Sequence, residues 1–357
     1  MADRAAVAAA RATLHRAVAA DRVFPAAVAE AGDSRGVLWR EAFGAHTFHD
    51  AGRPAHERTI FDLASLAKPI ATTSIVMRLA ADAMLDLREP VATFFREWRG
   101  EDREPATVLD LLEHAAGLAA RLVDPPPNGR REFEHEICTM RLEYAVRAKA
   151  VYSDLGFILL GFIAADRGRR SLDALFNAVI DGLGLDRSLS FGVPDSERDR
   201  TAPTMPLVED LRRGRALVGE VHDNYAAALG GVAGHAGLFG TAGGVGAFAR
   251  IALRGARGDE TVPIPLSPAL IARATRKSAV PGSSRALGWD TMLPTSSCGT
   301  RMSEAAFGHV GFTGTSVWID PARDRYYVLL TNRVCGGGTT EAMRTVRRTF
   351  HDALAAL

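Results

Sequence analysis

Hydrophobic residues at the two ends of the chain follow patterns that predict strands with helices outside them. Two β-like runs, 24–32 and 36–44, are joined by a short polar turn and are typical of a hairpin. Two further runs, 316–320 and 325–334, flank a Pro-Ala-Arg-Asp turn and predict a second hairpin. The first and last segments read as amphipathic helices, because apolar residues of the last segment recur at spacings of three and four. We therefore expect one antiparallel sheet built from both termini.

The middle of the chain has a different pattern. Residues 79–285 read as mostly helical, with connecting loops rich in proline and glycine. This arrangement predicts fold class α/β (α+β), in which helices flank an antiparallel sheet and an all-helical region is inserted. We assign residues 1–78 and 286–357 to the sheet domain and residues 79–285 to the inserted, mostly helical region.

Composition and charge narrow the class of protein. The 357 residues are 47% hydrophobic, enough for a large core in a two-part globular protein. The 43 basic and 42 acidic residues give a net charge of +1, so there is no electrostatic case for binding nucleic acid or an anionic membrane. The most apolar run, 155–165, is too short to cross a bilayer. Three widely spaced cysteines suggest reduced thiols. No export signal is seen at the N-terminus, so we expect a cytoplasmic protein, or a periplasmic one if a leader preceded it.

Three stretches match catalytic or binding motifs in letters only. Residues 32–36 spell G-x-S-x-G, but a nucleophile elbow needs a helix after it, and here a second strand follows. The glycine-rich stretch 230–246 lacks the Gly-Lys-Ser/Thr ending of a phosphate-binding loop. His46 and His49 have no third candidate ligand nearby, so no metal site is predicted.

The stretch FDLASLAKPIATT, residues 61–73, places a serine three residues before a lysine. Proline is tolerated only in the first turn of a helix, so Pro69 predicts a helix that begins near Ser65 and continues, largely buried, to Leu85. Ser65 and Lys68 then lie on the same helix face. A serine hydroxyl needs a base to become a nucleophile, and a lysine whose pKa is lowered toward neutrality can serve. The pair alone occurs by chance in many proteins, and by itself it favours a serine at a helix start with a solvated lysine.

Two further motifs follow in an informative order. A Tyr-Ser-Asp motif at 152–154 stands directly before the apolar run 155–165. A His-Val-Gly motif at 309–311, followed by Phe312 and Thr313, precedes the penultimate predicted strand. Serine with lysine, then a tyrosine that can shuttle protons, then a basic residue and a glycine on a strand form the motif order of active-site-serine enzymes that recognise penicillin.

With these motifs the chain resembles the serine β-lactamase superfamily, on the branch of class C β-lactamases, D-alanyl-D-alanine carboxypeptidases and family VIII esterases. The resemblance covers nearly the whole length. It includes the opening hairpin, the segment TVLDLLEHAAGL at 107–118, and GEVHDNYAAALGGVAGHAGLFGTA at 219–242, which resembles a subgroup of penicillin-binding-protein-like proteins and esterases. The resemblance implies a β-lactamase/transpeptidase-like fold.

The resemblance also implies roles for individual residues. Ser65 would be the acylated nucleophile, Lys68 its base partner and Tyr152 a second general acid/base group. His309 would occupy the position that lysine holds in the lactamases. The backbone N–H groups of Ser65 and Phe312 would form the oxyanion hole. Neither a metal nor an organic cofactor is implied. The substrate-binding positions implied are His309, Gly311, Phe312, Thr313 and Asp154.

The sequence departs from the family pattern in three places, one of which is Ala115 and Ala116, where threonine and serine are common. Asp154 stands where asparagine is usual, and a carboxylate near Lys68 would raise the lysine pKa unless Asp154 points elsewhere. His309 replaces lysine, so a positive charge for a substrate carboxylate would depend on pH. An alternative alignment gives the role of the tyrosine to Ser153, but it also loses the asparagine, and we prefer Tyr152.

The loop between the second and third motifs adds two candidates. We expect at least one of His222 and Asp223 to line the substrate cleft. The alternative is that these residues only stabilise their own loop through local hydrogen bonds.

Two classes of function follow from these residues. The first is a serine hydrolase that acts through an acyl-enzyme on a small ester, amide or β-lactam, as an esterase, a D-amino-acid peptidase or a β-lactamase-like enzyme. The alternative is a non-hydrolytic, penicillin-recognising protein of the same fold. Ser65, Lys68 and Tyr152 favour the first, and Asp154 is the main argument for the second.

Overall fold

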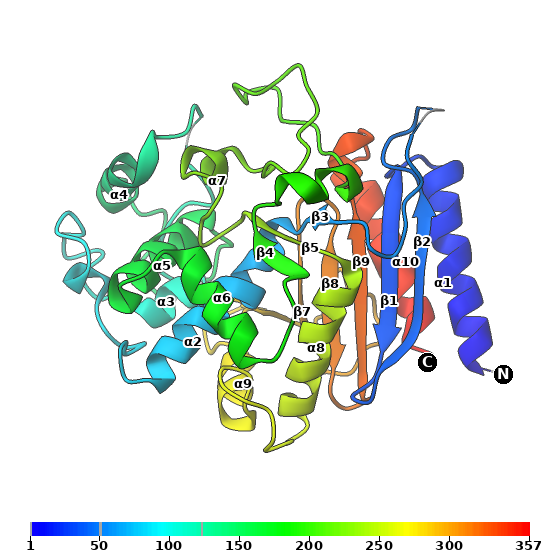
Figure 1. Cartoon of the computed structure of the whole chain (residues 1–357). Coiled ribbons are helices and arrows are strands. Elements are labelled where there is room, and N and C mark those ends of the chain that lie inside the picture. The colour runs from blue at the N-terminus through cyan, green and yellow to red at the C-terminus, as the bar shows by residue number, and fades with distance from the viewer. Residues whose placement is uncertain (1, 50–51, 123) are drawn as a thin grey trace.

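A six-stranded antiparallel sheet is the central feature of the computed structural model, which describes residues 2–49, 52–122 and 124–357 (Figure 1). The strand order is β2-β1-β9-β8-β7-β6. Strand β1 pairs with β2 on one side and with β9 on the other, so strands from both ends of the chain lie side by side. The predicted sheet from both termini is confirmed. Its strands are β1 (Ala26–Gly32), β2 (Val37–Gly44), β6 (Asp290–Thr291), β7 (Phe307–Val310), β8 (Ser316–Asp320) and β9 (Arg325–Thr331).

Helices cover both faces of this sheet. Helices α1 (Ala2–Ala19) and α10 (Thr340–Leu354) pack on one face, and α8 (Ala242–Ala256) packs on the other, as Figure 1 shows. Strand β1 is buried along its whole length because alternate side chains enter the two layers. Its residues Ala27, Ala29 and Ala31 join the core under α1 and α10, while Ala26 and Val28 join the core on the α8 side.

The remaining helices form a second body beside the sheet, at the left of Figure 1. Helix α5 lies at its centre and is apolar nearly all round, which is typical of a helix buried on every side. It contacts α2, α3 and α6. The helices of this second body are α2 (Ser74–Ala81), α3 (Val108–Leu112), α4 (Gly129–Thr139), α5 (Asp154–Gly168), α6 (Leu172–Gly182) and α7 (Asn224–Ala228). Helix α9 (Pro268–Ala274) instead packs on α8.

The inserted region is not purely helical. It contributes β4 (Leu189–Phe191) and β5 (Leu238–Gly240), which pair with β3 (Phe61–Asp62) in a small sheet of order β3-β5-β4. It also contributes α8, whose packing on the large sheet ties the two bodies together. The boundaries at residues 79 and 285 therefore stay a prediction.

The turn between β1 and β2 contains the G-x-S-x-G letters at residues 32–36. Asp33 accepts hydrogen bonds from the backbone N–H groups of Arg35 at 2.8 Å and Gly36 at 3.0 Å, which closes a compact hairpin turn. The G-x-S-x-G letters at 32–36 thus belong to a hairpin, as the sequence indicated.

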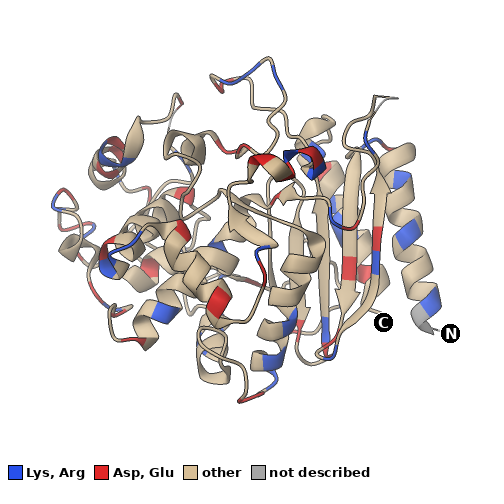
Figure 2. Ribbon diagram, viewed as in Figure 1, with Lys and Arg blue, Asp and Glu red and all other residues tan. Residues whose placement is uncertain are grey.

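Basic and acidic residues are interspersed along the ribbon, as Figure 2 shows, in keeping with the net charge of +1. None of the helices in the described ranges combines the length and the apolar character needed to cross a membrane.

Candidate active site

The segment that carries Ser65 begins with a sharp turn. A 3₁₀ turn at Ala64–Leu66 leads into a π-helical stretch at Lys68–Thr73, and α2 follows directly. The predicted helix start near Ser65 is confirmed, with Pro69 in the first turn of the π-helical stretch. The predicted continuation to residue 85 is wrong, since α2 ends at Ala81.

Asp62 holds this turn in place. Ala64 has a φ of 49°, a left-handed conformation that is unusual for a residue with a side chain. The buried carboxylate of Asp62 accepts the Ala64 N–H at 2.8 Å and the His222 N–H at 2.6 Å. Burial raises the pKa of Asp62 to about 6. The entry to Ser65 is therefore tied to the loop of His222.

Lys68 is buried directly behind Ser65. Its Nζ donates to Ser65 Oγ at 3.2 Å, to Asp154 Oδ1 at 2.7 Å and to the His235 carbonyl at 3.1 Å. Three acceptors match the three protons of an ammonium group. Burial alone would lower the pKa of Lys68, but the charge of Asp154 and the nearby Tyr152 outweigh it, and the pKa is raised above its usual value. Asp154 does point at Lys68, so at neutral pH the resting lysine is charged.

Tyr152 lies against the same lysine. The centroid of its ring is 4.9 Å from Lys68 Nζ. Burial raises the pKa of the Tyr152 hydroxyl above its usual value, although the charge of Lys68 opposes this. Ser153, the alternative candidate, caps α5 by accepting the Leu155 N–H, and its hydroxyl donates to the Ala119 carbonyl at 2.6 Å. The geometry therefore favours Tyr152 over Ser153 as the partner of Lys68.

His309, at the third motif, is a buried and neutral side chain. It lies on β7 with 2% of its surface exposed, and its ring centroid is 5.8 Å from that of Tyr152. Nδ1 donates to the Val310 carbonyl at 2.8 Å. Burial, with the charges of Arg285 and Lys68, holds the pKa of His309 well below its usual range. At neutral pH the His309 ring is therefore uncharged, and its role in binding a substrate carboxylate stays a prediction.

A positive charge beside Tyr152 comes instead from Arg285. The sequence motifs did not single out this residue. Its guanidinium carbon is 5.0 Å from the centroid of the Tyr152 ring. Arg285 lies just before β6 and far from every motif in the sequence, so no local pattern identifies it.

The loop after β7 packs tightly onto the strand before Ser65. A Cβ atom added to Gly311 would lie 2.6 Å from the Leu63 carbonyl oxygen, so only glycine fits this close approach. The Thr313 hydroxyl donates to the Asp62 carbonyl at 2.8 Å, and Thr313 is fully buried. Thr313 thus joins the third motif to the Ser65 segment, and the structure does not place it as a surface open to substrate.

Phe312 is the exposed member of this loop, with 49% of its surface accessible. Its ring stacks on His222 with centroids 5.6 Å apart. Burial lowers the pKa of His222 to about 4, so the stacked imidazole is neutral at physiological pH. The pair brings an aromatic surface from two distant segments next to the Ser65 turn.

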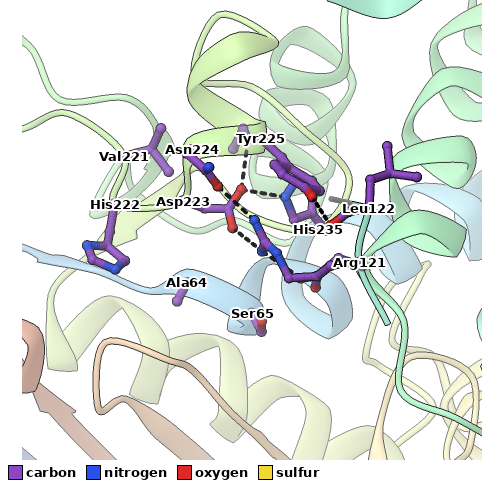
Figure 3. Close-up of polar contacts among 12 residues, drawn as sticks. Ala64, Ser65, Arg121, Leu122, Val221, His222, Asp223, Asn224, Tyr225 and His235 are labelled. Carbon is purple, nitrogen blue, oxygen red and sulfur yellow. Dashed lines mark hydrogen bonds and ion pairs between the residues drawn. The ribbon is translucent and has the colours of Figure 1, made fainter. Parts of the chain in front are cut away.

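Arg121 organises a polar network that the sequence reading missed (Figure 3). Its guanidinium donates to Asp154 at 3.1 Å, to Asp223 at 2.8 Å and to Asn224 at 2.7 Å. The Nε2 atom of His235 lies 2.7 Å from Asp223 Oδ1. Asp223 is therefore part of this network and also accepts the Ala226 N–H at the start of α7.

The network balances charge in a buried place. Burial opposes the ionisation of Asp154 and Asp223. The charge of Lys68 nevertheless lowers the pKa of Asp154 below its usual range. His235 and Arg121 do the same for the pKa of Asp223. Two carboxylates thus face the cations Lys68 and Arg121, which satisfies the requirement that buried charges be paired.

A cavity of 1110 Å³ opens beyond Arg121, toward α4. In the described part of the chain, no group of three or more His, Cys, Asp or Glu side chains is arranged to hold a metal ion. The cavity is lined by Glu97, Ala119, Arg121, Leu122, Pro125, Pro126, Pro127, Arg131, Glu132, His135, Glu136 and Met140.

Comparisons with known proteins identify the family of the chain. The profile of the Beta-lactamase family matches residues 10–349. A putative D-alanyl-D-alanine carboxypeptidase of Salmonella gallinarum is 28% identical over 309 residues, which cover 78% of this chain and 70% of the relative. The N-acetylmuramyl-L-alanine amidase of Bacillus subtilis is 28% identical over 344 residues, covering 87% and 77%. Among solved structures, EstCE1, a hydrolase with promiscuous acyltransferase activity, superposes with a TM-score of 0.77 at 20% identity and covers 99% of each chain.

These matches define the class of protein. Since the family profile spans nearly the whole chain, the chain belongs to the Beta-lactamase family. It has the β-lactamase/transpeptidase-like fold and is a serine hydrolase of this family, acting on small molecules.

Proposed function

We propose that this enzyme cleaves small amides and esters through an acyl-enzyme formed on Ser65. The observation that carries the proposal is the contact of 3.2 Å between Ser65 Oγ and the buried Nζ of Lys68, with Tyr152 packed on the same lysine. A serine held between two proton-carrying groups is the arrangement that nucleophilic catalysis requires.

The roles follow from the positions of the groups. In the form of the enzyme in which the pair Lys68 and Tyr152 has lost one proton, Ser65 attacks the substrate carbonyl and passes its proton to that pair. Tyr152 delivers a proton to the leaving group, since its ring lies against Lys68 and a phenol hydroxyl can pass a proton on. The backbone N–H groups of Ser65 and Phe312 stabilise the negative oxygen of the tetrahedral intermediate. A water molecule then hydrolyses the acyl-enzyme by the reverse sequence of proton transfers.

We propose a short peptide amide next to an alanine as the natural substrate, with esters as surrogates. The two relatives, a putative D-alanyl-D-alanine carboxypeptidase and an N-acetylmuramyl-L-alanine amidase, are both named for bonds at an alanine residue. Arg285, 5.0 Å from the Tyr152 ring centroid, is the cation that a substrate carboxylate would meet, because His309 is neutral.

Intact-protein mass spectrometry tests the assignment. The protein is exposed separately to a fluorophosphonate, a p-nitrophenyl ester, a penicillin and a peptide ending in D-alanyl-D-alanine, and hydrolysis is assayed in parallel. We expect one covalent adduct per chain with the fluorophosphonate, together with turnover of the ester and the peptide. The Ser65→Ala variant is expected to lose the adduct and the turnover of both substrates. A matched control is Ser34→Ala, in the hairpin turn, which keeps full labelling.

Two results would contradict the proposal. A penicillin adduct that persists without any turnover would support the non-hydrolytic, penicillin-recognising alternative. Labelling that survives in Ser65→Ala would place the nucleophile elsewhere.

A further inference from the structure

Arg347 is a buried cation without a carboxylate partner in the described part of the chain. It lies on α10 with 7% of its surface exposed, and no ion pair is formed by its guanidinium. Instead, its Nη2 donates to the Gly311 carbonyl at 2.6 Å and to the Thr315 carbonyl at 2.8 Å. Burial, together with the charge of Arg333, lowers the pKa of Arg347 to about 9. Placing a guanidinium here opposes folding, so its presence calls for a reason.

A second guanidinium approaches the same loop. Arg333, in the 3₁₀ turn Arg333–Cys335 after β9, donates to the Phe312 carbonyl through Nε at 3.1 Å and again through Nη2. Its guanidinium carbon is 4.7 Å from the centroid of the Phe312 ring. Arg333 also lacks a carboxylate partner among the described residues. The two cations therefore bind carbonyl groups of the loop that follows β7. Arg347 binds those of Gly311 and Thr315, and Arg333 binds that of Phe312.

The contact on Gly311 bears directly on the oxyanion hole. The Gly311 carbonyl and the Phe312 N–H belong to one planar trans peptide unit, in which they point in opposite directions. A charged donor on the carbonyl oxygen polarises the unit and makes its N–H a stronger donor. The same contact fixes the direction of that N–H before the reaction begins, which is what preorganised stabilisation requires.

We infer that Arg347 is a positioning residue for the oxyanion hole, acting through the Gly311–Phe312 peptide. This inference rests on the proposed function, in which the Phe312 N–H donates to the oxyanion. The competing interpretation is that Arg347 only staples α10 to the sheet. The two differ in what an oxygen-to-sulfur exchange in the substrate does, because a thiono sulfur accepts hydrogen bonds poorly.

The experiment compares a p-nitrophenyl ester with its thiono analogue for wild type, Arg347→Met and Arg347→Lys. Arg348→Met is the matched control, since Arg348 is the next residue on α10 and donates to the Ser296 carbonyl, away from the loop. Fluorophosphonate labelling rates and thermal unfolding are measured on every variant.

For Arg347→Met we expect kcat for the ester to fall about ten- to a hundredfold with KM changed less than about twofold, which is less than the full loss of an oxyanion donor. The ratio of kcat for the ester to kcat for its thiono analogue is expected to fall as well. Arg347→Lys is expected to restore part of the lost kcat and part of the lost ratio. Arg348→Met behaves as wild type.

If Arg347→Met lowers kcat equally for the ester and its thiono analogue, or lowers neither, the inference is overturned. Arg347 would then only attach α10 to the sheet. If Arg347→Met does not fold, Arg347→Lys carries the comparison, because it keeps the charge but reaches fewer carbonyl groups. A wild-type protein that neither turns over the ester nor reacts with the fluorophosphonate removes the proposed function and, with it, the inference. If wild type turns over the ester but both Arg347 variants keep the wild-type ratio of ester to thiono-ester kcat, the inference fails and the proposed function still stands.

Discussion

At the scale of single residues, the protonation state of Lys68 controls how the Ser65 proton can leave. Lys68 is fully buried and held by Asp154 at 2.7 Å, and its pKa is raised although burial acts in the opposite direction. The pKa of Tyr152 is raised as well, chiefly by burial. Both candidate bases therefore carry their protons at neutral pH, so kcat/KM is expected to rise with pH through the alkaline range.

Replacing Asp154 by asparagine tests this point. Without the carboxylate, burial dominates and the pKa of Lys68 falls, so the alkaline rise of kcat/KM is expected to move down by about one to two pH units and activity at pH 7 to increase. The measurement is kcat/KM for a neutral ester between pH 5 and 10. Asp166→Asn, at the other end of α5, is the control. An unchanged profile, or activity lost at every pH, would show that Asp154 does not restrain Lys68.

At the scale of elements, the packing of α5 against a glycine-rich loop positions the acceptor of Lys68. A Cβ added to Gly161 on α5 would lie 2.9 Å from the Gly234 nitrogen, so the two backbones are in direct contact. The Gly234 carbonyl accepts the Thr72 hydroxyl at 2.6 Å, and the next residue, His235, offers its carbonyl to Lys68. A shift of this loop is therefore transmitted to the site.

Two alanine substitutions on α5 have opposite expected effects. Gly161→Ala pushes the loop away and is expected to destabilise the protein by about 1–3 kcal/mol and to lower kcat. Gly156→Ala meets only ordinary contacts, the nearest at 3.5 Å from the Leu111 carbonyl, and is expected to stabilise by up to about 1 kcal/mol. Urea unfolding with ester assays measures both. Equal stability of the two variants would mean that the loop yields without cost.

At the scale of the whole molecule, buried neutral histidines couple stability to pH. Burial and the charge of Arg347 lower the pKa of His351 to about 3, and burial lowers that of His222 to about 4. Unfolded histidine takes up a proton below about pH 6.5, whereas these folded side chains do not. Stability is thus fully present above pH 6.5 and is lost as the pH falls toward 4. Asp62 acts in the opposite sense, because its pKa is raised to about 6 and the folded protein binds that proton first.

His351→Gln tests the coupling on one group far from Ser65. His351 Nε2 lies 3.1 Å from Ser316 Oγ, a contact that glutamine can replace without titrating. Between pH 6.5 and 4 the variant is expected to lose stability less steeply, by about 1.4 kcal/mol per pH unit. The measurement is the urea midpoint as a function of pH, with the exposed His135→Gln as control. Parallel curves for wild type and His351→Gln would contradict the coupling.

Local features of the sequence were enough for the sheet and for the start of the helical segment that carries Ser65 and Lys68. Alternating hydrophobic residues and turn residues act over a few positions, so both hairpins were predictable. The spacing of Ser65 and Lys68 and the position of Pro69 likewise determine a helix start by themselves. The helix length was not predictable, since α2 stops where Ala83 turns left-handed with a φ of 55°.

Only the tertiary structure decided what surrounds these groups. Arg121 and Arg347 reach the site from segments with no motif, and their partners lie far away in the chain. The neutral state of His309 and the charged state of Lys68 depend on burial and on charges a few ångströms away. Desolvation and Coulomb interactions follow distance in space rather than position in the sequence, so the chemistry of the site emerges only once the chain has folded.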